Sequence, residues 1–363
     1  MRIELKKVLF PQPKSKIKAG DGKANGKYKF FTSSPMQSKF VDEANYDKPA
    51  LIFGTGGNAS VHFCNEPFST STDCLVMYGR SKTELETIYN YLKSNIGMLE
   101  NGFKGAGLKH ISKDYILAIE IDLPSEEIQL DFLQKNRIID GLIEAKQAQL
   151  HLSEELVKSR FIEMFGDISQ ADKNSFVSMD SFCTISSSKR VHVADYVNSG
   201  IPFYRSKEII ELGENKNPSV ELFISREHYE AIKQKNYIPQ KNDILMSAVG
   251  TIGKMWIVDG IREFYYKDGN IMCIHSDSTN AIYLKFALSM LIDDFKDGNV
   301  GGSAYSALTI VKLNKMLVPL PPISLQNSFA EFVKQIEKSK LEIQQSIYKL
   351  ETLKKSLMQQ YFG

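Results

Sequence analysis

Residues 123–166 read LPSEEIQLDFLQKNRIIDGLIEAKQAQLHLSEELVKSRFIEMFG, and residues 320–363 read LPPISLQNSFAEFVKQIEKSKLEIQQSIYKLETLKKSLMQQYFG. The two stretches align without a gap at an offset of 197 positions, which is 363 minus 166. Identical residues recur along the alignment, among them Gln129 with Gln326 and Phe132 with Phe329. A repeat of this length indicates that one structural unit is used twice.

The correspondence continues upstream in the same order, through loops and the starts of strands. The matched pairs are 111–112 with 308–309, 102–107 with 298–302, 51–57 with the stretch ending at 249–253, and 73–76 with 270–273. Ser81 and Glu84 form a capping-box signature before an apolar helical pattern, whose partner is the run 282–291. We therefore expect an α+β fold of two mixed domains with an internal pseudo-two-fold repeat.

Each copy ends in a long helical pattern with an apolar stripe. In the second copy the stripe recurs every seven residues, as Phe329, Ile336, Ile343, Leu350 and Leu357, with Phe332, Ile347 and Tyr361 between them. In the first copy it is less regular and is interrupted at Gly141, and its members are Ile128, Phe132, Ile139, Leu142, Ala145, Leu152 and Leu156. A heptad repeat of this kind is typical of a coiled-coil seam.

The length of these helices limits how they can be packed. Forty residues of helix extend roughly 60 Å, which neither domain can bury. We predict an antiparallel coiled-coil pair with one globular domain at each end; pairing with a second chain in a homodimer is the alternative. The expected domains span 1–123 and 167–320, and the expected spacer helices span 124–166 and 321–363.

The composition is that of a globular protein, with 363 residues, 42% apolar and 24% charged, which is enough for two cores. No stretch approaches eighteen uninterrupted apolar residues, and the first thirty lack a signal-peptide core, so we expect a cytoplasmic protein without a membrane partner. The scattered cysteines predict reduced thiols and no metal site. They are Cys64, Cys74, Cys183 and Cys273. His62 and His275 lie two residues from a cysteine, at strand-like spacing, and core or surface filling explains both pairs best.

The distribution of charge is more informative than its total of +2. Residues 1–29 contain nine basic side chains against two acidic ones, a local excess of seven (nine minus two). A solvated terminus and a nucleic-acid contact explain this excess equally well.

Motifs that suggest an enzyme are incomplete. Residues 53–57 resemble the glycine loop of an S-adenosylmethionine-dependent methyltransferase, yet the chain has no Asn/Asp-Pro-Pro-Tyr/Phe tetrapeptide. Residues 250–254 lack the spacing and the Ser/Thr of a P-loop. Glu-x-Lys at 144–146 and 214–216 has no suitable acidic partner for a nuclease. We expect a non-catalytic chain that needs no cofactor.

What remains are polar and basic loops at strand ends, with side chains that can grip phosphates and touch base edges. The candidates in the first domain are Lys27, Lys29, Thr32, Ser33, Thr55, Asn58, Lys104 and Lys109. The candidates in the second domain are Ser188, Lys189, Arg190, Arg205, Lys207, Ser247, Thr251, Lys254, Ser303 and Tyr305.

An ordered series of residues resembles the target recognition domain of type I restriction-modification specificity subunits. The series runs through 200–205, 243–245, 250–253, 308–309, 319–322 and Gln326. The helix that ends at 357–363 is similar to the spacer helix of that family. The resemblance covers nearly the whole chain and depends on the order and repetition of these segments. The first domain is a looser match, notably at 26–32.

The resemblance implies a function and a set of partners. Two target recognition domains would each read one half of a bipartite double-stranded DNA site, and antiparallel helices would fix the gap between the halves. The implied partners are two modification subunits, which bind S-adenosylmethionine and methylate adenine, and restriction subunits, which use ATP and cut DNA. The chain itself would do neither.

Two other interpretations remain open at this point. The chain could be the DNA-recognition part of a split methyltransferase-nuclease enzyme. It could also be a coiled-coil adaptor with no DNA role, in which case binding to duplexes would show neither salt dependence nor sequence preference.

Overall fold

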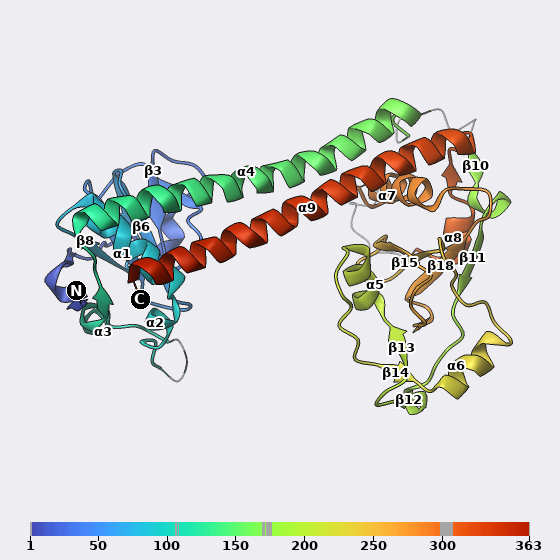
Figure 1. The fold of residues 1–363 in the computed structure, drawn as a ribbon, viewed down its shortest axis with the longest axis horizontal. Helices are drawn as coiled ribbons and strands as arrows, with labels where there is room; N and C mark the ends of the chain where they lie inside the picture. The colour runs from blue at the N-terminus through green and yellow to red at the C-terminus, as the bar shows by residue number, and fades with distance from the viewer. Residues whose placement is uncertain are drawn as a thin grey trace. The chain divides into compact units, whose positions relative to one another are not determined.

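A computed structural model describes residues 2–105, 107, 109–168, 171, 176–297 and 308–362. The chain divides into two compact units, one formed by Met1–Gln149 with Glu342–Gly363 and the other by Leu150–Leu341. Each unit contains one globular domain and parts of the two long helices, α4 (Glu126–Phe165) and α9 (Ile323–Phe362), which are labelled in Figure 1. Among the described residues, no helix has the length and apolar character needed to cross a membrane.

The first domain contains a four-stranded antiparallel sheet and a three-stranded sheet. The strand orders are β2-β8-β5-β6 and β4-β3-β7, and β1 pairs separately with β9. In chain order the strands are β1 (Arg2–Glu4), β2 (Phe10–Pro11), β3 (Tyr28–Phe31), β4 (Lys39–Val41), β5 (Ala50–Gly54), β6 (Ser60–Cys64), β7 (Phe68–Thr70), β8 (Cys74–Tyr78) and β9 (Glu120–Asp122). The helices are η1 (Leu5–Lys7), η2 (Ala19–Asp21), α1 (Lys82–Ser94), α2 (Gly97–Glu100) and α3 (Lys113–Ala118).

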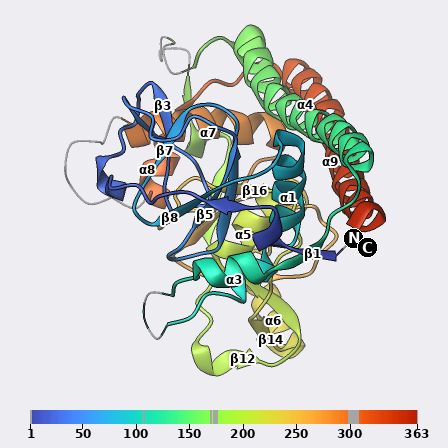
Figure 2. The same cartoon turned by 90° about the vertical axis from the view of Figure 1, so that its left-hand side faces the viewer.

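Strand β5 is buried along its whole length. Its successive side chains point to opposite sides of the sheet, so they enter two different cores. Leu51 and Phe53 join a core with α1, which lies beside the sheet (Figure 2). Ala50 and Ile52 face a second core shared with the three-stranded sheet. Helix α1 begins as expected, because the Ser81 hydroxyl accepts a hydrogen bond from the backbone N–H of Glu84 at 3.1 Å.

The second domain is built in the same way. Its sheets have the orders β11-β18-β15-β16 and β12-β14-β13-β17, and β10 pairs with β19. In chain order the strands are β10 (Val177–Ser178), β11 (Thr184–Ser187), β12 (Tyr196–Val197), β13 (Ile201–Tyr204), β14 (Phe223–Ile224), β15 (Ile244–Ser247), β16 (Met255–Ile257), β17 (Tyr265–Tyr266), β18 (Ile271–His275) and β19 (Leu317–Val318). The helices are η4 (Met179–Ser181), η5 (Val193–Asp195), α5 (Ser206–Gly213), α6 (Arg226–Lys233), α7 (Ala281–Asp297) and α8 (Ile310–Asn314).

The expected duplication is confirmed by the topology. In both domains the four-stranded sheet has the same order, and the second sheet contains one parallel pair, β3 with β7 and β13 with β17. Strand β15 also contributes to two cores, since Met246 faces one and Leu245 the other. The second domain has the additional elements β12, α5 and α6 between its matched strands.

The junction before each long helix is also duplicated. The buried side chain of Gln129 donates from Nε2 to the carbonyl oxygen of Pro124 at 2.8 Å, and Gln326 donates to Pro321 at 2.8 Å. The short helices α3 and α8 begin at equivalent caps, where the hydroxyl of Ser112 or Thr309 accepts from the backbone. The identical glutamines therefore have the same structural role.

The long helices pack antiparallel, as the sequence predicts. In the first unit, Phe132 near the start of α4 packs against Tyr361 and Phe362 at the end of α9. In the second unit, Phe161 near the end of α4 packs against Phe329 near the start of α9. The start of one helix thus meets the end of the other in each unit.

The seam on α4 differs from the expected stripe. Phe132 and Ile139 are buried, and on α9 Phe329 and Leu357 are buried. The other expected members on α9 are half-buried, namely Phe332, Ile336, Ile343, Ile347, Leu350 and Tyr361. Five predicted positions on α4 are wrong, because their side chains are exposed: Ile128 (44%), Leu142 (47%), Ala145, Leu152 (64%) and Leu156 (49%). The next residues, Ile143 and Val157, are half-buried and buried instead, so the packed face is displaced by one residue from the apolar stripe.

Candidate nucleic-acid interface

In the first domain, three loops meet at one end of the four-stranded sheet. Gly54 at the end of β5 lies opposite Ser60 at the start of β6 and Cys74 at the start of β8. Strand β3 ends at Phe31, whose carbonyl accepts from the backbone N–H of Ser71 at 2.8 Å. We call the residues at this end, 32–34, 55–59, 104–105 and 109–110, the first loop edge.

Hydrogen bonds from hydroxyl groups hold the first loop edge together. Ser33 Oγ and Thr55 Oγ1 both donate to the carbonyl oxygen of Asp73, at 2.7 and 2.9 Å. The backbone N–H of Gly56 donates to Ser33 Oγ at 3.3 Å. Two of the predicted candidates are thus close together although they lie on different loops.

The third loop brings lysines to the same place. Lys104 and His110 exchange backbone hydrogen bonds of 2.9 and 3.0 Å, which closes the loop on itself. Gly57 donates from its N–H to the carbonyl of Lys109 at 3.3 Å, and Nδ1 of His110 lies 3.0 Å from the carbonyl oxygen of Thr55. Lys104, Lys109 and Asn58 have exposed side chains on this edge.

The remaining candidates of the first domain lie further along β3. Lys27 is exposed next to the Tyr28 ring, with its Nζ 5.0 Å from the ring centre. Lys29 forms an ion pair with Glu66 at 2.6 Å, and this hydrogen bond raises the pKa of Lys29. Both lysines precede the end of the strand, whereas Thr32, which is half-buried, follows it. The structure does not bring Lys27 or Lys29 into the first loop edge.

The second domain has an equivalent edge. Ser247 at the end of β15 lies opposite Ile271 at the start of β18, and Ser187 at the end of β11 lies opposite Met272. The residues at this end, 188–190, 205–207, 248–254 and 267–270, form the second loop edge. Gly57 and Gly250 each lie three residues beyond the matched strand and have φ of 80° and 74°, a conformation that favours glycine.

Ion pairs and a tyrosine connect the loops of the second edge. Lys189 donates from its backbone N–H to the hydroxyl oxygen of Tyr265 at 2.7 Å. Arg190 pairs with Asp268, with Nε 3.1 Å from Oδ2. The backbone N–H of Lys267 donates to the carbonyl of Tyr204 at 2.9 Å, which joins this loop to the end of β13 and to Arg205.

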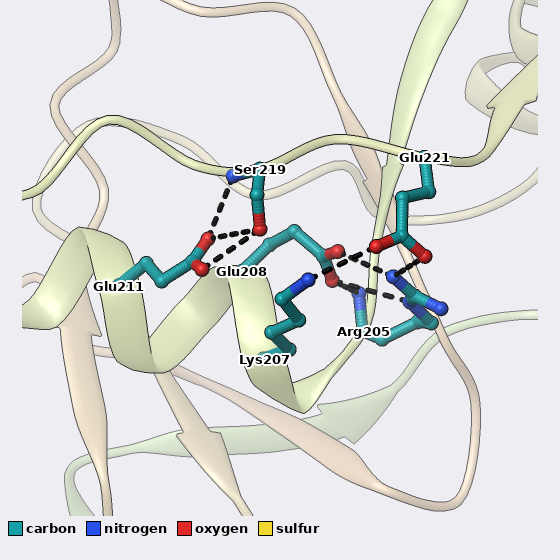
Figure 3. Close-up of polar contacts among 6 residues, drawn as sticks. All are labelled: Arg205, Lys207, Glu208, Glu211, Ser219 and Glu221. Carbon is teal, nitrogen blue, oxygen red and sulfur yellow. Dashed lines mark hydrogen bonds and ion pairs between the residues drawn. The ribbon is translucent and has the colours of Figure 1, made fainter. Parts of the chain in front are cut away.

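Arg205 is surrounded by carboxylates, as Figure 3 shows. Its guanidinium contacts Glu208 Oε1 at 2.8 Å and Glu221 Oε2 at 2.9 Å, and Lys207 Nζ contacts Glu221 Oε1 at 3.0 Å. These hydrogen bonds raise the pKa of Arg205, with the largest contribution from Glu208, and Glu221 raises the pKa of Lys207. Sequence reasoning missed both glutamates, although the spacing of Arg205 and Glu208 at the start of a helix is a signal for such a pair.

Two predicted contact residues are corrected by their burial. Ser247 is fully buried, and its hydroxyl accepts from the backbone N–H of Lys254 at 3.1 Å and donates to the carbonyl of Thr251. Thr55 is 9% exposed and donates to Asp73 as described above. Both hydroxyls shape a loop rather than present themselves to a ligand. Lys189, Arg190, Lys207, Thr251 and Lys254 are exposed and Ser188 is half-buried. Ser303 and Tyr305 lie outside the described residues.

The pair Cys273 and His275 belongs to a polar cluster at the other end of the second domain's sheet. His275 Nδ1 lies 2.7 Å from Asp243 Oδ1, and the Tyr237 hydroxyl donates to Asp243 Oδ2 at 2.6 Å. The bond to Asp243 raises the pKa of His275, while burial raises the pKa of Cys273. Among the described residues, no group of His, Cys, Asp or Glu side chains could hold a metal ion.

Two domains of one topology, each with a polar loop edge at the same strand ends and each leading into a long helix, define a duplicated recognition protein. The chain matches the family described as the type I restriction modification DNA specificity domain over residues 4–151 and 172–352. The chain belongs to this family. The resemblance seen in the sequence is therefore confirmed, and the protein is a specificity subunit with two DNA recognition domains.

Relatives and solved structures agree with this assignment. A putative type I restriction enzyme specificity subunit of Haemophilus influenzae is 23% identical over 329 residues, which cover 87% of this chain and 81% of the relative. The type I restriction-modification S subunit from M. genitalium has a similar fold, with a TM-score of 0.62, 14% identity and coverage of 100% and 96% of the two chains. A chain from a study of complex assembly and conformational transition of a type I system has a TM-score of 0.61 and 14% identity, with coverage of 99% and 97%.

Proposed function

We propose that each domain of this specificity subunit reads one half of a bipartite site in double-stranded DNA. One observation carries the proposal: the two loop edges occur at equivalent strand ends but have different side chains. A shared framework with separately variable surfaces suits a protein that reads two unlike half-sites. The division into recognition domains at 1–123 and 167–320 and spacer helices at 124–166 and 321–363 is part of this proposal.

The exposed and half-buried side chains at the two edges have the chemistry that such reading requires. Lysine and arginine bind phosphates, while hydroxyl and amide groups contact base edges or backbone. On the first edge these residues are Thr32, Ser33, Asn58, Lys104 and Lys109. On the second edge they are Ser188, Lys189, Arg190, Arg205, Lys207, Thr251 and Lys254. Lys27 and Lys29 contact DNA outside the edges in this proposal.

The long helices set the distance between the half-sites and dock the partner subunits. Two sites on one spacer bind a duplex jointly only where their separation fits the DNA, so the spacer determines the gap that is accepted. The partners are two modification subunits, which methylate adenine, and restriction subunits. Methyl transfer, ATP use and DNA cleavage belong to those subunits, and the chain acts without catalysis, cofactor or metal.

Methylome sequencing tests the proposal directly. Cells that carry this chain with its modification subunits are compared with cells that carry the modification subunits alone. We expect methyladenine in a two-part motif with a gap of constant length, only when the chain is present. A variant with Lys189→Gln and Arg190→Gln should lower methylation at that motif, and a variant with Lys235→Gln, at an exposed lysine after α6, should not. Methylation at an undivided motif, or without this chain, would contradict the proposal.

A further inference from the structure

One carboxylate beside the second loop edge contacts two of its cations at once. Glu221 places Oε2 2.9 Å from Arg205 Nη2 and Oε1 3.0 Å from Lys207 Nζ (Figure 3). Arginine and lysine are the side chains with which proteins bind DNA phosphates. The carboxylate therefore stands where the oxygens of a phosphate group would bind.

The two carboxylates around Arg205 differ in their exposure. The Glu208 side chain is 1% exposed and also accepts from the backbone N–H of Arg205 at 2.8 Å, so it fixes the arginine at the start of α5. The Glu221 side chain is 57% exposed, and the Lys207 side chain is 50% exposed. Glu208 is a permanent partner of Arg205, whereas solvent reaches Glu221 and a soluble anion can replace it.

The backbone that carries Glu221 is held in place. The next residue, Leu222, accepts from the backbone N–H of Phe203 at 2.9 Å. Two residues before Glu221, Ser219 donates to the Glu211 carboxylate from its backbone N–H at 2.7 Å and from its hydroxyl at 2.8 Å. The segment thus keeps the carboxylate opposite Arg205 and Lys207, and only its side chain must rotate to release them.

All three groups are charged at neutral pH. Hydrogen bonds to Lys207 and Arg205 lower the pKa of Glu221, and the same contacts raise the pKa of both cations. The contact is therefore an ion pair that competes directly with phosphate. An exposed pair of this kind is weak and is screened by salt.

We propose that Glu221 is an internal competitor for the DNA backbone, which occupies Arg205 and Lys207 until a phosphate group displaces it. This inference rests on the proposed DNA-reading function. Each phosphate contact at these cations must first break an ion pair, so random DNA binds more weakly than the cations alone would allow. A cognate site meets the same penalty but offsets it through its additional base contacts, so Glu221 lowers the occupancy of random DNA.

Removal of the competitor tests the idea. The full chain and its Glu221→Gln variant are titrated with labelled duplexes of mixed sequence, by fluorescence anisotropy, over a range of salt concentrations. We expect the variant to bind roughly three- to tenfold tighter, because two exposed ion pairs no longer oppose binding. The slope of log K against log salt should steepen by about one, since the patch gains one positive charge.

A matched variant separates this effect from a general change of charge. Glu263→Gln removes the same charge from Arg226, which Glu263 contacts at 2.7 Å and which keeps its contact of 3.8 Å with Glu230. Arg226 follows Ile224, which pairs with Ile201 at the other end of β13. The affinity of the Glu263→Gln variant for DNA should stay within about twofold of the parent. In the double variant with Lys207→Gln, about half of the gain from Glu221→Gln should disappear.

The possible outcomes are distinct. If the parent binds DNA with salt dependence and the two variants Glu221→Gln and Glu263→Gln have the same affinity, the competitor role of Glu221 is overturned while the DNA-reading function stands. If no variant binds DNA, the proposed function itself fails and the competitor fails with it. Binding by Glu221→Gln but not by the parent supports both. The single tryptophan, Trp256, is buried in the second domain, and its fluorescence verifies that each variant is folded.

Discussion

The two loop edges occupy equivalent positions but are held together by different forces. On the first edge, neutral hydroxyls of Ser33 and Thr55 donate to one carbonyl oxygen. On the second edge, Arg190 pairs with Asp268 and Arg205 pairs with two glutamates. Neutral hydrogen bonds are insensitive to ionic strength, whereas exposed ion pairs are screened. The contacts that hold the loops of the first edge are thus indifferent to salt, whereas those that hold the loops of the second edge respond to it.

The largest expected effect concerns the aromatic anchors that both units share. Phe132 and Phe329 are aligned residues and both are fully buried. Phe329→Ala should lower the free energy of unfolding by about 3–5 kcal/mol, because it leaves a cavity among Phe161, Phe165 and Phe286. Phe132→Ala should cost less within this range, since its aromatic neighbours are Tyr361 and Phe362. Urea titration followed by circular dichroism measures both.

An exposed position supplies the control for the anchors. Leu130 is 53% exposed on α4, and Leu130→Ala should change the free energy of unfolding by less than about 0.5 kcal/mol. Equal losses for Leu130 and Phe132 would mean that the seam of the first unit is misassigned.

The next effect separates the two glutamine junctions. Gln326 donates to Pro321 and also accepts from the backbone N–H of Asn280 at 2.9 Å, which fixes the start of α7. Gln326→Leu should therefore lower the free energy of unfolding by about 1–3 kcal/mol, because it leaves two backbone groups without their hydrogen bonds. The loss should exceed that of Gln129→Leu. Urea unfolding followed by circular dichroism measures both variants, and Trp256 fluorescence separately reports the second domain. A larger loss for Gln129→Leu would show that the junctions are not ordered in this way.

A smaller effect distinguishes the edges by salt. Lys189→Gln should reduce the slope of log K against log salt by about one, because one phosphate contact is lost. Ser33→Ala should leave that slope unchanged and instead weaken the first domain by about 1 kcal/mol, through the lost bond to Asp73. Anisotropy titrations with DNA measure the slope, and thermal unfolding measures the stability. Equal slopes for Lys189→Gln and the parent would remove the lysine from the interface.

The smallest effect is a pH dependence confined to the second domain. Asp243 raises the pKa of His275 above 6.5, so the folded state favours the charged imidazole. The stabilisation is fully present below the unfolded pKa, near 6.5, and is lost as pH rises through the higher folded value. In His275→Gln the free energy of unfolding should no longer fall between these two pKa values. Urea unfolding followed by Trp256 fluorescence at several pH values measures it. Asp277→Asn, at a 96% exposed carboxylate, should retain most of the fall.

Local pattern was sufficient to predict the architecture. The gap-free repeat predicts the duplication, and the heptad spacing of α9 predicts a coiled-coil seam. The presence of two such long helices in one chain favours the antiparallel pair. The apolar stripe of α4 predicted the wrong face of the helix, since Leu142 and Leu156 are exposed while Ile143 is half-buried and Val157 is buried. Gly141 interrupts the period there, and only the partner helix determines which face is covered.

The interface was predicted less well than the fold. A serine in a glycine-rich loop indicates an exposed hydroxyl, yet Ser247 is buried and serves the loop backbone. The pairing of Lys207 with Glu221 joins residues fourteen positions apart across two elements. No periodic signal reports such a contact, because it depends on how the segment before β14 returns to α5.

The glutamine at the start of each long helix has a mechanical consequence. The peptide between a strand and a helix is ordinarily a hinge, since rotation about a few backbone bonds redirects the helix. Here the side-chain amide of Gln129 or Gln326 bonds to the proline carbonyl five residues earlier, across that hinge. The bond restrains rotation at the junction, so we expect motion of the helix to be passed to strand β9 or β19.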